Sequence, residues 1–238
     1  EIVFGAANQA GEDNRNVARM AALLAGLPDS VPGITVNRLC ASGMSAVTLA
    51  SQAVRAGDAD VVVAGGVESM TRAPWVQAKP QRAWAKPGEA FDTSIGWRFI
   101  NPAMDARPKA TYSMPETAEE VARVDHISRD DADEFALRSH HNALSAIDRG
   151  DFAQEIVPVP TARGEVTTDE GPRRDTTSDA LAALRPVVVG GAVVTAGNSS
   201  SLNDGSSAIV VASAAAIQRY GLVPRARIVS SAAVGLAP

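Results

Sequence analysis

The sequence predicts an α/β fold in which a layered α-β-α core is interrupted by a loop-rich insertion. Residues 1–71 alternate short apolar runs with amphipathic stretches, and residues 191–238 return to the same pattern. Between them, residues 72–190 hold all three Trp and ten of the 14 Pro, and the hydrophobic periodicity fades. Long irregular segments in compact proteins are usually functional loops. We therefore expect residues 1–71 and 191–238 to form one core domain and residues 72–190 to form an inserted loop domain.

The first core segment reads as strands and helices in alternation. The expected elements are strands at 1–5, 33–38 and 60–64 and helices at 14–24 and 42–56. Val17, Met20, Ala21 and Leu24 give the first helix its 3.6-residue spacing. Gly57 follows the second helix at the position where a left-handed cap is needed. Strands joined by helical crossovers of this length run parallel, so we expect a parallel sheet.

Two helices are expected inside the insertion. One begins at Ser113, with Pro115 in its first turn and Glu116 beside the positive end of the helix. The other begins at Ser128 with a start similar to a capping box, runs to about residue 148 and ends at Gly150. The residues expected to form its core-facing stripe are Phe135, Ala136, Ala143, Ala146 and Ile147.

The last core segment is predicted to hold three strands and one helix. The strands are expected at 193–196, 208–212 and 226–234, the second of them buried, with a turn at 203–205 and a helix at 214–220. The chain begins in the middle of an apparent strand without Met and stops just after the last strand, at 235–238. We therefore expect a fragment of a longer protein.

Composition excludes several classes of function. The net charge is −5 and there is no Lys/Arg-rich run, whereas a nucleic-acid-binding protein needs a basic face. The longest apolar stretches are far shorter than a membrane span, and no signal peptide opens the chain. One Cys and three His make neither an internal disulfide nor a convincing zinc site. We expect a cytoplasmic protein without nucleic-acid or membrane partners and without a metal.

Cys40 is the chemically most informative residue. It follows a predicted strand, and Ala41, Ser42 and Gly43 after it open a predicted helix and leave room for a bulky acyl group. The N–H groups and dipole at a helix start favour a thiolate, and the Cys40 N–H can stabilise an oxyanion on the thioester of the same cysteine. A lone cysteine is also often a small buried apolar residue. Spacing alone leaves both interpretations open.

Three motifs resemble the thiolase family, and together they extend the resemblance over the whole chain. They are Asn-Arg-Leu-Cys-Ala-Ser-Gly-Met at 37–44, Val-Ala-Gly-Gly-Val-Glu-Ser-Met-Thr at 63–71, and Val-Thr-Ala-Gly-Asn at 194–198 followed by Leu-Asn-Asp-Gly at 202–205. Residues 8–16, 91–99 and 113–118 are further similar to the branch that acts on 3-oxoadipyl-CoA. The resemblance implies the first half of a thiolase fold, with the loop domain inserted in that half.

The resemblance also implies site residues. Cys40 would be the nucleophile of a ping-pong reaction in which acyl-CoA and CoA are the partners and no metal or redox cofactor takes part. Arg173 would lie near the adenine end of CoA, Ala196 and Ser200 along the pantetheine arm, and Met114 against the acyl or pantetheine end. Each has a simpler interpretation: Arg173 as a solvated loop charge, Met114 as core packing, and Ser200 as a polar turn residue.

The sequence departs from the family pattern in several places. Ser201 replaces a usual glycine, Ser113 replaces a histidine of the short-chain acetoacetyl-CoA enzymes, and Ala180 replaces a CoA-binding serine. The catalytic histidine and second cysteine of the family's C-terminal half are absent, and His126, His140 and His141 are expected to be surface or helix-face residues without a catalytic role. The resemblance implies a homodimer or homotetramer. The alternatives are an acetoacetyl-CoA thiolase, a ketoacyl synthase, which the second motif disfavours, and an inactive CoA-binding fragment. A nucleotide-binding dehydrogenase is weaker, because no Gly-x-Gly-x-x-Gly follows a strand.

Overall fold

The computed structural model describes residues 1–236, which form two compact units. The first unit combines residues 1–108 with the C-terminal segment from Leu202, and the second covers residues 109–201. Residues 72–108, expected in the insertion, group with the first unit, and residues 191–201, expected in the core, group with the second. Side-chain hydrogen bonds described below account for both groupings. The inserted loop domain itself stays a prediction, because compactness does not define an insertion.

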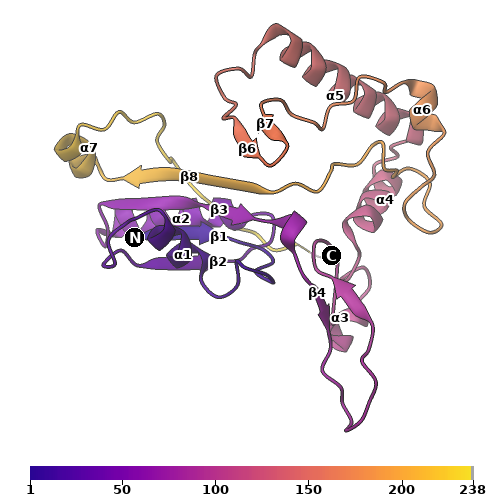
Figure 1. The fold of residues 1–238 in the computed structure, drawn as a ribbon, viewed down its shortest axis with the longest axis horizontal. Coiled ribbons are helices and arrows are strands. Elements are labelled where there is room, and N and C mark those ends of the chain that lie inside the picture. The colour runs from indigo at the N-terminus through magenta and orange to yellow at the C-terminus, as the bar shows by residue number, and fades with distance from the viewer. Residues whose placement is uncertain (237–238) are drawn as a thin grey trace. The chain divides into compact units, whose positions relative to one another are not determined.

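A four-stranded sheet forms the centre of the first unit (Figure 1). The strands lie in the order β2-β1-β3-β8. β1 pairs in parallel with β2 and with β3, as the sequence predicts, and β8 pairs antiparallel with β3. Their bounds are Ile2–Gly5 for β1, Gly33–Val36 for β2, Val61–Glu68 for β3 and Gly205–Ala212 for β8. The carboxyl ends of three parallel strands therefore meet at one edge of the sheet.

Helices α1 (Val17–Leu24) and α2 (Ser42–Ala56) pack on opposite faces of this sheet. Successive strand residues point to opposite faces. Ile2 of β1 packs with Ala18 and Ala22 of α1, whereas its neighbour Val3 packs with Ala46 and Ala50 of α2. The predicted α-β-α layering is thus present. Helix α1 begins later than expected because the side chain of Asn16 accepts a hydrogen bond from the Arg19 N–H and caps it.

The predicted helix ends depend on caps, and the structure has them. Gly57 ends α2 with a φ of +81°, in the left-handed region expected for it. Helix α7 (Ala214–Tyr220) has the predicted bounds, because Ser213 accepts a hydrogen bond from the Ala216 N–H at its start and Gly221 ends it with a φ of +62°. Local capping signals therefore fix these helices.

Three expectations for the C-terminal segment are wrong. β8 is present but not buried: it is an edge strand of the described sheet, and Ile209 is 49% exposed. Residues 203–204 form no turn, since the Asp204 carboxylate accepts hydrogen bonds from the Thr71 N–H and hydroxyl at 2.9 and 2.6 Å and these residues lead straight into β8. Residues 226–234 form no strand; the carbonyls of Ile228 and Val229 accept from the Arg55 guanidinium instead of from a neighbouring strand. The end of the chain at 237–238 lies outside the described residues.

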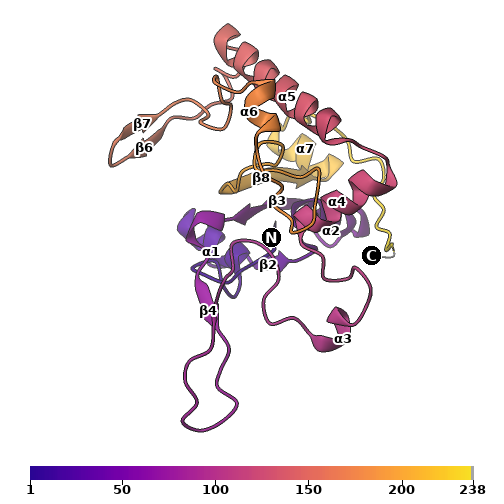
Figure 2. The same cartoon turned by 90° about the vertical axis from the view of Figure 1, so that its right-hand side faces the viewer.

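Residues 72–108 are attached to the sheet by polar side chains. The short strands β4 and β5 form a hairpin that projects away from the sheet (Figure 2). At its base the buried Thr93 hydroxyl donates to the Pro74 carbonyl at 2.6 Å, and the Asn8 side chain donates to the Thr93 carbonyl. The elements of this segment are the 3-10 helix η1 (Met70–Arg72), β4 (Trp75–Gln77), β5 (Ala90–Asp92) and α3 (Pro102–Asp105).

The second unit is built on two capped helices, α4 (Met114–Val124) and α5 (Arg129–Arg149). Ser113 and Ser128 each form a full capping box, with Glu116 and Asp131 respectively, so both predicted helix starts are confirmed. One stripe residue of α5 is misplaced: Phe135 is 65% exposed, whereas the other four are half-buried. The remaining elements are β6 (Val159–Thr161), β7 (Gly164–Val166) and α6 (Ser178–Ala182), which packs beside α5 (Figure 2).

Candidate functional site

Cys40 is a free, solvent-exposed thiol between the end of β2 and the start of α2. Leu39 before it adopts a φ of +47°, a left-handed conformation that is uncommon for a non-glycine residue. The Ser42 side chain holds this turn, accepting from the Arg38 N–H at 2.8 Å and donating to the Leu39 carbonyl at 2.6 Å. Cys40 is therefore presented to solvent on a constrained turn, and it is not a buried core residue.

Glycines allow the start of α2 to contact the sheet edge directly. A Cβ on Gly5, the last residue of β1, would lie 2.3 Å from the Ser42 carbonyl carbon and 2.5 Å from the Gly43 nitrogen. A Cβ on the paired Gly66 of β3 would lie 2.7 Å from the Gly5 carbonyl oxygen. Any larger residue at these two positions would push the backbone apart. The two glycines thus allow the Cys40 turn to lie close against the ends of β1 and β3.

Two polar side chains at the strand ends connect the loops around Cys40. The Asn37 amide donates to the Ala7 carbonyl at 2.8 Å, and its oxygen accepts from the Leu39 N–H at 2.8 Å. The Glu68 carboxylate accepts from the N–H groups of Ala7 and Asn8 at 2.7 and 3.3 Å. The loop after β1 is thereby tied both to the Cys40 turn and to the end of β3.

No role was assigned to Asn8, Asn37 or Glu68 in the sequence analysis. The available signal was their position: Asn37 is near the end of the predicted strand at 33–38, and Asn8 and Glu68 follow the predicted strands at 1–5 and 60–64 by three and four residues. The ligand sites of parallel sheets lie at this edge.

The other candidate residues belong to the second unit. Met114 is the first residue of α4 and is 63% exposed, so it is not a core residue in this structure. Ser113, which precedes it, is the N-cap: its N–H and its hydroxyl donate to the Glu116 carboxylate, both at 2.7 Å. The serine found here in place of a histidine therefore has a structural use as a cap.

Ala196 and Ser200 lie, both exposed, on a loop that is anchored from within. The Asn198 side chain accepts from the Thr195 N–H at 2.7 Å and donates to the carboxylate of buried Asp133 at 2.9 Å. Asp133 in turn forms an ion pair with Arg129 at 2.7 Å. This network attaches the loop to α5 and explains why residues 191–201 group with the second unit.

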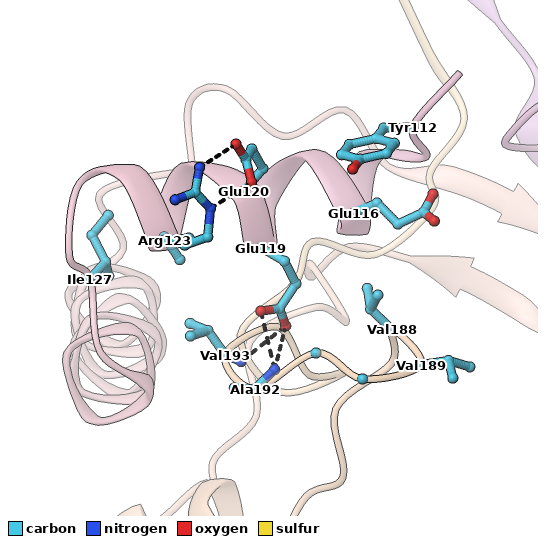
Figure 3. Close-up of a pocket in the computed structure, with 13 residues that line it drawn as sticks. Tyr112, Glu116, Glu119, Glu120, Arg123, Ile127, Val188, Val189, Ala192 and Val193 are labelled. Atoms are coloured by element: carbon cyan, nitrogen blue, oxygen red, sulfur yellow. Dashed lines mark hydrogen bonds and ion pairs between the residues drawn. The ribbon is translucent and has the colours of Figure 1, made fainter. Parts of the chain in front are cut away.

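Glu119 explains why the predicted strand at 193–196 is absent. Its carboxylate points from α4 into the loop and accepts hydrogen bonds from the N–H groups of Ala192 and Val193 (Figure 3). It accepts a third from the Val194 N–H. Burial raises the pKa of Glu119. The hydrogen bonds from the three N–H groups lower it by more, so the pKa lies below its ordinary value. α4 and residues 188–193 line a hollow of about 520 Å³ beside this contact. The Glu119 carboxylate thus occupies the N–H groups of Val193 and Val194, which a strand at 193–196 would need for pairing.

Arg173 lies on an exposed loop of the second unit. Its N–H donates to His140 Nδ1 at 3.1 Å, and its guanidinium is 3.7 Å from the Asp175 carboxylate. Beside it, Arg174 pairs with Asp148 at 2.6 Å, and the hydrogen bond from Arg174 lowers the pKa of Asp148. Arg173 is thus an accessible cation with only a long ion pair. Its role and those of Cys40, Met114, Ala196 and Ser200 stay predictions.

Within residues 1–236, no cluster of three or more His, Cys, Asp or Glu side chains is arranged to hold a metal ion. In the same range no helix combines the length and the apolar character that crossing a bilayer requires.

Comparison with known proteins decides the family. A family model described as "Thiolase, N-terminal domain" matches residues 1–215. The chain belongs to the thiolase family. Among curated thiolases, it is 54% identical over 246 residues to the beta-ketoadipyl-CoA thiolase of Pseudomonas aeruginosa. It is 52% identical over 243 residues to the 3-oxoadipyl-CoA/3-oxo-5,6-dehydrosuberyl-CoA thiolase of Escherichia coli. Each alignment covers all of this chain and 60% of the relative, so the chain spans about 60% of the length of these thiolases.

A solved thiolase confirms the fold class. The human mitochondrial 3-ketoacyl-CoA thiolase, crystallised in complex with CoA, superposes with a TM-score of 0.80 at 30% identity. The match covers 94% of this chain and 55% of that structure. The predicted fold, the first half of a thiolase, is therefore confirmed.

Proposed function

We propose that this chain is the nucleophile-bearing part of a thiolase that cleaves 3-oxoadipyl-CoA with CoA to acetyl-CoA and succinyl-CoA. The observation that carries the proposal is the exposed Cys40 thiol on its constrained turn at the start of α2. The proposed substrate is supported by the names of the two thiolases compared above, which are 54% and 52% identical to this chain. The sequence motifs at 8–16, 91–99 and 113–118 point to the same branch.

The chemistry needs two acyl transfers. The Cys40 thiolate adds to the C3 carbonyl, and the C2–C3 bond breaks with its electron pair passing to the acetyl-CoA enolate, which takes a proton at C2. The succinyl group is then held as a thioester on Cys40. CoA loses its thiol proton to a base, its sulfur attacks this thioester, and the Cys40 thiolate leaves. The thioester of the substrate stabilises the enolate, so the proposal includes neither a metal nor a redox cofactor.

The second unit supplies the proposed CoA contacts. Arg173 would bind near the adenine end, Ala196 and Ser200 along the pantetheine arm, and Met114 near the acyl end. Their exposure is consistent with ligand contact. The acid and base for the proton transfers belong, by family resemblance, to the C-terminal half of a thiolase. We further propose a cytoplasmic homodimer or homotetramer as the active form.

Cleavage assays on the full-length protein that carries this chain test the proposal. The expected result is a higher kcat/KM for 3-oxoadipyl-CoA than for acetoacetyl-CoA, and a loss of about 10³-fold or more in Cys40→Ser. A preference for acetoacetyl-CoA would replace the proposed substrate with that of a biosynthetic thiolase. Binding of CoA without any cleavage would support the third alternative, a CoA-binding protein without catalysis.

A further inference from the structure

Arg98 holds a positive charge that no carboxylate neutralises within residues 1–236. Its guanidinium donates a hydrogen bond to the side-chain oxygen of Asn8, which is a neutral group. It forms none of the ion pairs found among the described residues. The side chain is nevertheless half-buried. A partly desolvated guanidinium without a counter-ion is an effective receptor for a carboxylate, which it can bind through two parallel N–H groups.

The backbone around Arg98 forms a tightly curved loop. Gly96 adopts a φ of +84° and Phe99 a φ of +51°, so the backbone is in the left-handed region on both sides of Arg98. The Phe99 ring packs edge-to-face on Phe91 of β5, with 5.5 Å between the ring centroids. Asn8 and this loop conformation together position the Arg98 side chain.

A continuous series of contacts joins Arg98 to the nucleophile turn. Asn8, which holds the guanidinium, is fixed by its own hydrogen bonds to the Thr93 carbonyl and the Glu68 carboxylate. Ala7 before it accepts from Asn37, and Asn37 accepts from the Leu39 N–H next to Cys40. Both ends of this series belong to the first unit. The Glu68 carboxylate, the acidic group in this series, is already occupied by two backbone N–H groups.

We propose that Arg98 binds the distal carboxylate of the acyl chain and thereby selects dicarboxylic 3-oxoacyl-CoA substrates. This inference rests on the proposed function. In 3-oxoadipyl-CoA the carboxylate lies three carbon–carbon bonds beyond the C3 carbon that Cys40 attacks. The charged group therefore has to be recognised close to the nucleophile, and Arg98 is the half-buried cation connected to the Cys40 turn. Asn8 acts as a positioning residue that orients the guanidinium without cancelling its charge.

Arg38 is the competing candidate, because it is two residues before Cys40. Its environment differs: it is exposed and lines a second hollow with Ser45, Leu49 and Gln52 on the outer side of α2. It therefore serves as the comparison variant for an arginine that is near Cys40 in sequence but not linked through Asn8.

Competition between two substrates tests the inference in the full-length enzyme. The pair is 3-oxoadipyl-CoA and 3-oxohexanoyl-CoA, which has a methyl group where the former has a carboxylate. The measured quantity is the ratio of the two kcat/KM values on one enzyme sample, so a partly misfolded preparation does not alter it. We expect Arg98→Gln to lower this ratio by about 10- to 100-fold, the size of a lost charge-assisted hydrogen bond.

Two more variants make the result specific. Arg98→Lys keeps the charge and is expected to retain part of the preference, whereas Asn8→Asp places a carboxylate on the guanidinium and is expected to reduce the preference. Arg38→Gln is expected to leave the ratio within about 3-fold of the wild type. If Arg98→Gln has no measurable activity, the ratios of Arg98→Lys and Asn8→Asp decide.

The outcomes separate the two proposals. An unchanged ratio in the Arg98 and Asn8 variants, or a collapse of the ratio in Arg38→Gln instead, overturns the role of Arg98 and leaves the proposed function standing. A wild-type enzyme that does not favour 3-oxoadipyl-CoA overturns the proposed substrate and the inference together.

Discussion

Gly5 and Ser42 are in direct backbone contact where β1 ends and α2 begins. A Cβ on Gly5 would lie 2.3 Å from the Ser42 carbonyl carbon, which is closer than Cβ atoms in proteins approach non-bonded atoms. The start of α2, and with it the Cys40 turn, can take this position only because β1 ends in glycine. The position of the Cys40 turn at the sheet edge thus depends on the absence of a side chain at Gly5.

Gly5→Ala is therefore expected to displace Cys40. The added methyl group has to push α2 away from the sheet, and overpacking of this kind costs about 1–3 kcal/mol of stability. A displacement of about 1 Å at a reacting group lowers the rate by as much as about 10²-fold. Urea denaturation and kcat/KM of the full-length enzyme measure the two effects. Gly88→Ala is the matched control, because no atom lies within 4 Å of a Cβ at that position; an equal loss in both variants would contradict the account.

Asn37→Ala is expected to release the loop after β1 from the Cys40 turn. The change removes the side-chain partner of the Ala7 carbonyl and of the Leu39 N–H, which water can replace at this exposed site, so we expect a cost of about 1 kcal/mol. Because the Leu39 turn is then less constrained, the modification of Cys40 by iodoacetamide is expected to change in rate while remaining stoichiometric. Labelling kinetics followed by mass spectrometry check this. An unchanged rate together with unchanged stability would show that Asn37 does not hold the turn.

Asn198→Ala is expected to free the loop that carries Ala196 and Ser200. The substitution removes the acceptor for the Thr195 N–H and leaves buried Asp133 without one of its donors. We expect a loss of about 2–3 kcal/mol and a raised KM for CoA with a smaller effect on kcat. Asn142→Ala, on the exposed side of α5, is the control. A normal KM for CoA in Asn198→Ala would argue against a role of this loop in binding.

Glu119 makes the stability of the second unit dependent on pH. Its folded-state pKa lies below the unfolded value of about 4.3, so its contribution is complete above that pH and is lost as the pH falls below it. Glu119→Gln retains the shape of the side chain but is neutral at every pH. We expect wild-type stability to fall more steeply than that of the variant between about pH 5 and 3. An equal fall in the stability of the wild type and of Glu119→Gln over this pH range would mean that the charge of Glu119 does not strengthen its hydrogen bonds to the three N–H groups.

The sequence contained clear local signals for much of the fold. Ser113, Ser128 and Gly57 are capping residues, and the helices begin or end at them as expected. The failures share a physical cause. The apolar runs at 193–196 and 226–234 have strand-like composition, but Glu119 and Arg55, distant in sequence, occupy their backbone groups. The pattern of a short segment carries no information about such long-range partners.

For the candidate site, too, the sequence predicted the local features and missed the long-range contacts. The position of Cys40 before a helix followed from its neighbours in the sequence. The link from Asn37 to Ala7 and the link from Asn8 to Arg98 join segments 30 and 90 residues apart, and no periodicity encodes them. Only the position of polar residues after strand ends pointed to them.

The central claim is that Cys40 accepts the acyl group. Mass spectrometry of the full-length protein after brief incubation with 3-oxoadipyl-CoA in the absence of free CoA tests it directly. The account predicts one added succinyl group, located on the peptide that contains Cys40, removable by CoA and absent in Cys40→Ser. Release of acetyl-CoA with no acyl group on Cys40, or the same adduct in Cys40→Ser, would contradict it.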